Sequence, residues 1–195
     1  MNENRLPMQP NAGMRLAGSA ILRLFGWKIQ GNFPDLPKAV VIAAPHTSNW
    51  DFIIGIAAKS KLQLKIHWLG KHTLFRKPFD QLLRWLGGTP VERNSSQGIV
   101  EQTIELFRNQ EQFLLGLSPE GTRKKVERWK TGFYQIAKGA GVPIIPVAFD
   151  YFKKIVLIGQ PLEPSGSTEK DFERLRAFYS DVKGKVPQNF NADFS

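Results

Sequence analysis

The sequence has no cysteine among its 195 residues. Disulfide bridges, thiolate ligands for a metal and a cysteine nucleophile are therefore excluded. Any covalent intermediate formed on this chain would need serine, threonine or another nucleophile. The absence also fits a reducing compartment, where disulfides are rare.

Long apolar runs are absent as well. No segment reaches the roughly 18 apolar residues that a membrane-spanning helix requires, and the longest, residues 39–45 and 52–58, have the length of a strand or a short helix. Residues 1–9 are polar and lack the basic and then apolar pattern of a signal peptide. The sequence therefore predicts a cytoplasmic protein whose contact with a membrane is peripheral.

Acidic residues and histidines are few. The chain carries 17 Asp and Glu against 27 Lys and Arg, a formal charge of +10, which favours nucleic acid, anionic lipid headgroups or phosphorylated substrates as partners. Only His46 is followed closely by a carboxylate, so His67 and His72 are interpreted as structural or surface residues. Three scattered histidines predict no metal site.

Apolar segments alternate between two periodicities along most of the chain, which is typical of an α/β fold. We expect one domain over residues 1–195, with a largely parallel central sheet covered by helices. Strands are predicted at residues 38–44, 65–69, 89–92, 112–117, 143–149 and 154–158, and helices at residues 50–59, 79–86, 97–109, 132–139 and 168–182.

The N-terminal part is expected to contain a loose tail, residues 1–12, followed by an amphipathic helix over residues 13–29. Arg15 and Arg23 flank the apolar stripe of that helix. Two interpretations stay open at this point: the helix lies in a membrane interface, or it packs on the domain core.

The segment Pro45-His46-Thr47-Ser48-Asn49-Trp50-Asp51 follows a predicted buried strand. A strand-to-helix turn can bring the carboxylate of Asp51 beside the imidazole of His46. Such a carboxylate orients the ring and stabilises the imidazolium, which makes the other nitrogen a general base for a hydroxyl. The alternative is structural, because Ser48 and Asp51 also have the spacing of a helix capping box.

Cationic side chains follow other predicted strands. Lys71, Arg93 and Arg123 each come after a strand, and the carboxyl ends of parallel strands meet at one edge of a sheet, where ligands bind. This placement describes one base surrounded by cations and suits an anionic substrate. The basic stretch 123–130 includes Trp129 and is compatible with phosphate binding, with base stacking on nucleic acid, or with a solvated loop.

Four blocks of the sequence together resemble the lysophospholipid and glycerol-phosphate acyltransferase family. The resemblance covers residues 38–150, and the motif-bearing core is expected there. The matching residues are His46 and Asp51 (H-x4-D), Glu92-Arg93 after two glycines, Glu120-Gly121-Thr122-Arg123 (E-G-T-R) and Val142-Pro143-Ile144-Ile145-Pro146-Val147, with Lys71 between the first two blocks. Departures are Glu92, where the family often has Asp, and Ser118, where it often has Phe.

The resemblance implies an O-acyltransferase of phospholipid biosynthesis, similar to 1-acylglycerol-3-phosphate acyltransferases. It implies His46 as general base, Asp51 as its orienting partner, and direct transfer without a metal or cofactor. The acyl donor would be acyl-CoA or acyl-carrier protein, and the acceptor a phosphorylated or lipid hydroxyl compound. The residues implied in substrate binding are Lys71, Arg93, Glu120, Gly121, Thr122 and Arg123.

The resemblance also implies work at the cytoplasmic face of the membrane, with the protein attached peripherally. The alternative is a non-catalytic protein that binds lipid or nucleic acid through its basic groove. The His46/Asp51 pair argues against it, since binding alone needs no base, and no nucleic-acid partner is expected. The G-x-S-x-G elbow of serine hydrolases is absent from the sequence.

Overall fold

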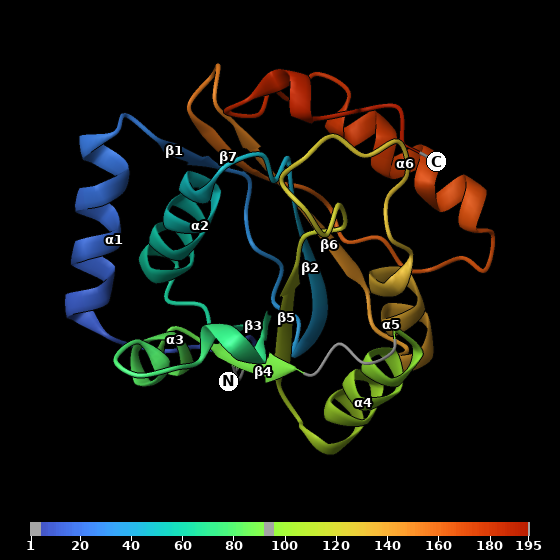
Figure 1. The fold of residues 1–195 in the computed structure, drawn as a ribbon, viewed down its shortest axis with the longest axis horizontal. Coiled ribbons are helices and arrows are strands. Elements are labelled where there is room, and N and C mark those ends of the chain that lie inside the picture. The colour runs from blue at the N-terminus through green and yellow to red at the C-terminus, as the bar shows by residue number, and fades with distance from the viewer. Residues whose placement is uncertain (1–4, 92–95, 195) are drawn as a thin grey trace.

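The computed structural model describes residues 5–91 and 96–194 of the chain (Figure 1). Its helices are α1 (Ala12–Leu24), α2 (Asn49–Lys61), α3 (Asp80–Trp85), α4 (Ser96–Asn109), α5 (Gly132–Ala140) and α6 (Thr168–Tyr179), with short 3-10 helices η1 (His72–Leu74) and η2 (Pro187–Asn189). Its strands are β1 (Lys28–Gln30), β2 (Lys38–Ala44), β3 (Ile66–Lys71), β4 (Gly88–Val91), β5 (Phe113–Leu117), β6 (Ile144–Asp150) and β7 (Ile155–Ile158).

The strands form one seven-stranded sheet in the order β1-β7-β6-β2-β5-β3-β4. Every neighbouring pair is parallel except β6 and β7, which are antiparallel. The predicted α/β fold with a largely parallel sheet is therefore confirmed. Because β2, β5, β3 and β4 run in one direction, the segments that follow them emerge at the same edge of the sheet.

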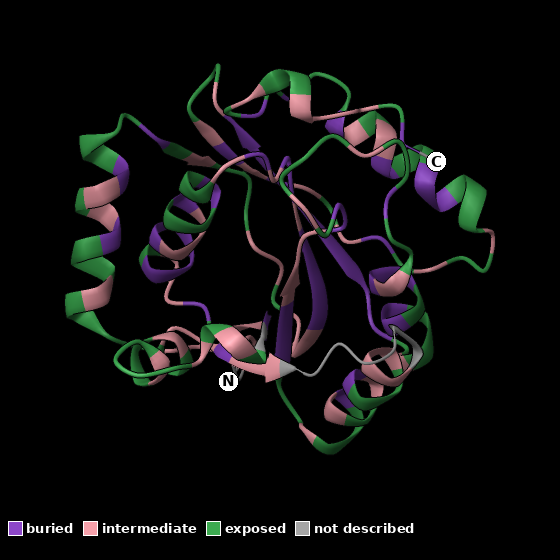
Figure 2. Ribbon diagram, viewed as in Figure 1, coloured by how far each residue is buried: buried purple, intermediate pink, exposed green. Residues whose placement is uncertain are grey.

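Helices cover both faces of the sheet, with α1 and α2 on one side and α4, α5 and α6 on the other (Figure 1). Strand β2 contributes to both cores because successive side chains point to opposite faces. Val40 and Ile42 pack with the α5 and α6 side, whereas Ala39 and Val41 pack with the α1 and α2 side. Figure 2 shows the central strands buried and the outer helix surfaces exposed.

Helix α1 is shorter than the predicted helix over residues 13–29. It ends at Leu24, and Gly26 has a φ of +72°, a conformation that terminates helices and favours glycine. Trp27 then donates its N–H to the carbonyl of Leu22 at 2.7 Å, and the chain continues into β1. The segment predicted as the last helical turn is therefore an edge strand paired with β7.

The N-terminal residues that the structure describes are not loose. The N–H of Lys65 donates to the carbonyl of Pro7 at 2.9 Å, and the N–H of Gln9 donates to the carbonyl of Gln63 at 2.8 Å. Asn11 caps α1 by accepting the N–H of Met14 at 2.9 Å. The predicted tail is thus wrong for residues 5–11, and residues 1–4 lie outside the described part of the chain.

One face of α1 packs closely on α2. A Cβ at Gly18 would lie 2.5 Å from the carbonyl oxygen of Ala57, so only glycine permits this approach of the two helices. Leu22 is fully buried in the same contact, yet Leu16 and Leu24 on α1 remain exposed. Among the described residues, no helix combines the length and hydropathy needed to cross a bilayer.

Candidate active site

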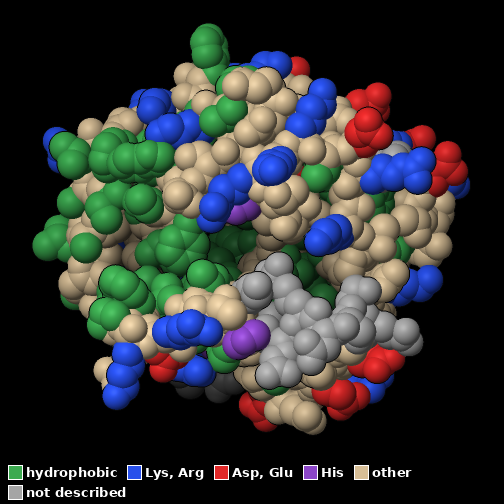
Figure 3. Space-filling model, viewed as in Figure 1, with side chains coloured by type: hydrophobic (Ala, Val, Ile, Leu, Met, Phe, Trp, Pro, Cys, Tyr) green, Lys and Arg blue, Asp and Glu red, His purple; other side chains and the backbone are tan. Residues whose placement is uncertain are grey.

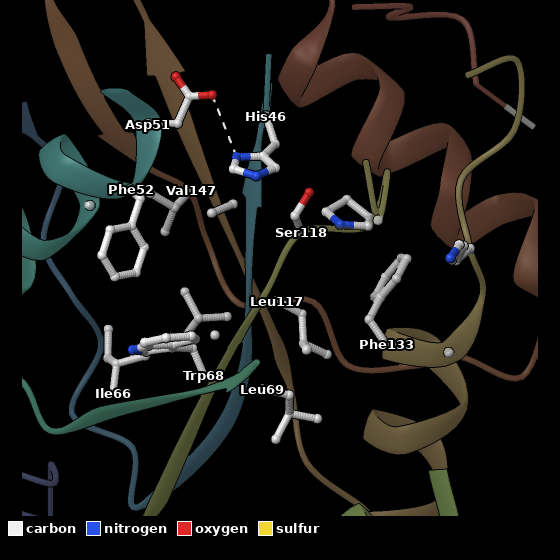
Figure 4. Close-up of a pocket in the computed structure, with 18 of the residues that line it drawn as sticks. His46, Asp51, Phe52, Ile66, Trp68, Leu69, Leu117, Ser118, Phe133 and Val147 are labelled. Atoms are coloured by element: carbon white, nitrogen blue, oxygen red, sulfur yellow. Dashed lines mark ion pairs between the residues drawn. The ribbon is translucent and has the colours of Figure 1, made fainter. Parts of the chain in front are cut away.

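His46 lies in the short loop between β2 and α2, at the carboxyl edge of the sheet. Its Nδ1 is 3.4 Å from Oδ2 of Asp51, in the first turn of α2 (Figure 4). The same Oδ2 accepts the N–H groups of Thr47 and Ser48, each at 2.7 Å. The capping box and the His–carboxylate pair are therefore both present, because one carboxylate oxygen serves the helix terminus and the imidazole together.

The carboxylate of Asp51 is buried, with 1% of its side chain exposed. Its second oxygen, Oδ1, accepts the hydroxyl of Tyr151 at 2.7 Å. Burial, together with the bond to Asp51 and its charge, raises the pKa of Tyr151, so the phenol stays a neutral donor. Groups from two segments, the loop of residues 46–48 and Tyr151 after β6, thus hold the carboxylate in place.

Tyr151 was not anticipated from the sequence. It follows β6 directly and so emerges at the same edge of the sheet as His46. The only available signal was that position after the predicted strand 143–149, since Tyr151 belongs to none of the four sequence blocks.

The imidazole of His46 is partly accessible, with 25% of the side chain exposed. An Nδ1–H directed at the carboxylate leaves Nε2 as a hydrogen-bond acceptor. His46 also lines a cleft at the carboxyl edge of the sheet. This arrangement presents a basic nitrogen to whatever occupies the cleft.

Glu120 supports the loop of His46 rather than pairing with Arg123. It is buried, and its Oε2 accepts the backbone N–H of His46 at 2.6 Å and the hydroxyl of Ser118 at 3.3 Å. Its Oε1 is buried with no hydrogen-bond partner among the described residues. Burial, reinforced by the charge of Asp51, raises the pKa of Glu120 to about 7, although the two hydrogen bonds act in the opposite direction.

Glu120→Gln is expected to remove part of the pH dependence of stability. The pKa of Glu120 rises from 4.5 to about 7 on folding. The stabilisation by this group is therefore complete below about pH 4.5 and is lost as the pH rises through 7, on the order of 3 kcal/mol in all. Urea unfolding of wild type and E120Q across this window measures it. A stability difference that does not vary with pH would contradict the assignment.

The E-G-T-R segment follows β5 and reaches the cleft. Gly121 has a φ of +66°, and a Cβ there would lie 2.9 Å from Cε of Lys130, so the turn requires glycine. Gly121, Thr122 and Arg123 line the cleft together with Lys124 and Lys130. No ion pair of Arg123 is found in residues 5–91 and 96–194, which leaves its charge available to an anion.

Trp129 does not offer a stacking surface for a base. It is buried and stacks on Phe194 with ring centroids 3.5 Å apart. The interpretation of residues 123–130 as a nucleic-acid site with a stacking tryptophan is therefore wrong.

The remaining predicted cations are described only in part. Lys71 ends β3 at the expected edge, but its side chain lies outside the described part of the structure. Glu92 and Arg93 lie outside it entirely. His67 packs against the ring of Phe113, and His72 is exposed in η1. Within the described ranges, no group of three potential metal ligands is found.

The cleft has a volume of about 1660 Å³ and combines an apolar interior with a polar mouth. Figure 3 shows the hollow bordered by basic side chains, and Figure 4 shows apolar side chains below the imidazole. The apolar lining includes Phe52, Ile66, Trp68, Leu69, Leu117, Phe133 and Val147. A long apolar chain and an anionic group fit together in such a space.

The sequence model of the acyltransferase family matches residues 28–150, which include β1 to β6 and the whole loop of His46. The chain belongs to the acyltransferase family. This acyltransferase is also similar to 1-acyl-sn-glycerol-3-phosphate acyltransferases of two bacteria. The protein of Haemophilus influenzae is 28% identical over 183 residues, which cover 83% of this chain and 75% of the relative.

The Escherichia coli protein is 31% identical over 134 residues, covering 64% of this chain and 53% of its own length. The crystal structure of the 1-acyl-sn-glycerophosphate acyltransferase from Thermotoga maritima is similar with a TM-score of 0.58. The alignment covers 83% of this acyltransferase and 73% of that chain at 22% identity, which establishes a shared fold.

Proposed function

We propose that this acyltransferase moves a fatty acyl group from acyl-CoA or acyl-carrier protein to the hydroxyl of a lysophosphatidic acid-like acceptor. One observation carries the proposal: the His46–Asp51 pair lies at the mouth of an apolar cleft bordered by cations. The family membership and the names of the two bacterial relatives support the same substrate class.

In the proposed reaction, Nε2 of His46 accepts the proton of the acceptor hydroxyl. The hydroxyl oxygen attacks the thioester carbonyl, and an oxygen–carbon bond forms as the carbonyl oxygen takes up negative charge. Collapse of this intermediate breaks the carbon–sulfur bond, and the leaving thiolate takes the proton from the imidazolium, which yields the free thiol and restores neutral His46. Asp51 orients the ring and stabilises its positive charge. No acyl-enzyme, metal or cofactor takes part.

The lining of the cleft suggests how both substrates bind. The apolar interior around Trp68 and Val147 suits an acyl chain, because burial of each methylene contributes about 0.8 kcal/mol. Arg123 and Lys130 at the mouth suit phosphate oxygens. By family resemblance, Lys71 and Arg93 complete the anion site, and Gly121 and Thr122 shape it. Glu120 contributes by holding the backbone of His46 rather than by touching the acceptor.

The acceptor and product of this reaction are membrane lipids, so the enzyme is proposed to act peripherally at the cytoplasmic face of the membrane. The net charge of +10 favours the anionic surface found there.

The test is release of free thiol from palmitoyl-CoA and from palmitoyl-carrier protein. The acceptor panel contains lysophosphatidic acid, glycerol 3-phosphate, other lysophospholipids and no acceptor. We expect release only with acceptor, fastest with lysophosphatidic acid, and phosphatidic acid as the product. Release at the same rate without acceptor would identify a thioesterase and overturn the proposal, as would no release with either donor.

A further inference from the structure

The segment that follows α6 runs along the loops that carry the candidate catalytic groups. It comprises residues 183–194, with the 3-10 helix η2 inside it, and we call it the strap. In Figure 1 it crosses the top of the view, above the yellow loop that follows β5. The strap lies beyond residues 28–150, which match the family, and none of the four sequence blocks contains it. Its role is therefore not given by the family pattern.

The first part of the strap packs on the loop of His46. The N–H of Val186 donates to Oγ1 of Thr47 at 3.2 Å. A Cβ at Gly184 would lie 2.9 Å from the same oxygen, so a larger residue there would push the strap and the loop apart. Because Thr47 follows His46 directly and donates its own N–H to Asp51, a shift of Thr47 would displace the catalytic pair.

The same part of the strap contacts both sides of the Asp51 carboxylate. The N–H of Tyr151, whose phenol donates to Asp51, itself donates to the carbonyl of Lys183 at 2.8 Å. On the other side, Nζ of Lys185 lies 4.5 Å from the ring centroid of Trp50, the residue before Asp51. The strap therefore supports the groups that orient the imidazole.

The second part of the strap binds the E-G-T-R loop. Nδ2 of Asn189 donates to the backbone carbonyl of Arg123 at 3.1 Å. Farther along, the ring of Phe194 is fully buried and stacks on Trp129 at an interplanar angle of 8°. Nη1 of Arg176 on α6 donates to the carbonyl of Phe194 at 2.8 Å, which fixes that end of the strap. The cationic loop is thus held at Arg123 and again at Trp129.

The strap connects two loops that the sheet alone does not fix. Strands β2 and β5 pair with each other as far as Ile42 and Leu117, so the loops that follow them extend beyond this ladder. Glu120 joins the loops from the buried side by accepting the N–H of His46, and the strap joins them from the outer side. An acceptor whose hydroxyl meets the imidazole while its phosphate meets Arg123 requires a fixed separation of the loops. A misplacement of about 1 Å can cost roughly a hundredfold in rate.

We propose that the strap is a positioning element for acyl transfer. Asn189 fixes the backbone of Arg123 and so places its guanidinium for the acceptor phosphate, while Gly184 and Val186 fix the loop of His46. Both parts act through groups that meet the substrate rather than by touching it. The inference rests on the proposed function, because it takes the acceptor to be phosphorylated. It follows that the two ends of the strap control different kinetic constants.

Asn189→Ala is expected to raise KM for lysophosphatidic acid about fivefold and to leave kcat unchanged, because one hydrogen bond no longer holds the arginine. In an Arg123→Gln background, the same substitution is expected to have no further effect on the dissociation constant of this acceptor, measured by calorimetry. The control is Asn191→Ala, whose side chain bonds to Asp193 within the strap and which is expected to keep the wild-type KM. An unchanged KM in Asn189→Ala, or a loss of equal size with and without Arg123, would overturn the assignment.

Thr47→Val is expected to lower kcat about tenfold and to leave KM for the acceptor unchanged. The valine keeps the shape of the side chain but no longer accepts the N–H of Val186, so the loop of His46 loses its outer support. Thr47→Ser keeps the hydroxyl and is expected to recover most of the rate. Equal losses in the two variants would show that packing, rather than the bond to the strap, is responsible.

Hydrogen–deuterium exchange tests the strap without turnover. Asn189→Ala is expected to speed exchange in peptides covering residues 119–131, and Thr47→Val in peptides covering residues 183–187, each about fivefold. Wild-type protein that releases no thiol, in the presence of these exchange changes, would overturn the proposed function and leave the strap standing. Unchanged exchange in either variant, or faster exchange throughout the chain, would overturn the strap even in an active enzyme.

Discussion

His46→Ala is expected to lower kcat for acyl transfer by about a thousandfold or more. General base catalysis contributes roughly 10²–10⁴ in rate, and the imidazole is the only basic nitrogen held by a buried carboxylate in the described part of the cleft. Without it, the acceptor hydroxyl must attack while still protonated. Initial rates of thiol release at saturating acceptor measure kcat, and KM for the acceptor is expected to change little.

The control for this substitution is His72→Ala. His72 is exposed in η1, so its removal tests the loss of an imidazole away from the cleft and is expected to leave kcat unchanged. His46 is itself 25% exposed, so the substitution removes little core packing. A His46→Ala enzyme with more than about a tenth of the wild-type rate would show that another group acts as the base.

The strand pattern of this chain was predictable because buried strands carry their own signal. After Lys38, residues 39–44 form an uninterrupted apolar run, and β2 has the predicted bounds 38–44. Strand β1 was missed because it pairs through backbone groups at a sheet edge. Its three residues give too short an alternation of polar and apolar side chains to be recognised. The ordered backbone of residues 5–11, which was predicted to be a loose tail, was missed for a related reason, since its hydrogen bonds to residues 63–65 are made by backbone groups.

The His46–Asp51 contact was predictable because both residues lie in one local turn. The residues that hold this pair in place were not predictable. Tyr151 reaches Asp51 from a strand end a hundred positions later, and Glu120 reaches the N–H of His46 from a third strand. Those contacts depend on strand order, which a single sequence does not report. The exposure of Phe79 and Trp85 was unpredictable for the same reason, because it depends on which elements pack beside α3.

Asp51→Asn is expected to have the second large effect, a loss in kcat approaching 10⁴. That is the cost of the same change in Ser–His–Asp enzymes, where the imidazole adopts the wrong tautomer and loses its charge partner. Here the carboxylate also accepts the N–H groups of Thr47 and Ser48 through one oxygen. An amide NH₂ directed at those donors leaves buried groups unpaired, which costs about 1–3 kcal/mol of folding stability. Thiol release and urea unfolding of the variant measure the two effects.

Tyr151→Phe provides the matched control for Asp51→Asn. It removes one hydrogen bond to Oδ1 but keeps the negative charge and the three contacts of Oδ2. We expect a loss of about tenfold or less in kcat, and about 1 kcal/mol in stability, because a single hydrogen bond contributes on that scale. If the charge of Asp51 sets the tautomer of His46, the two variants differ by at least about a hundredfold in kcat. Equal rates in the two variants would mean that Asp51 serves only to cap α2.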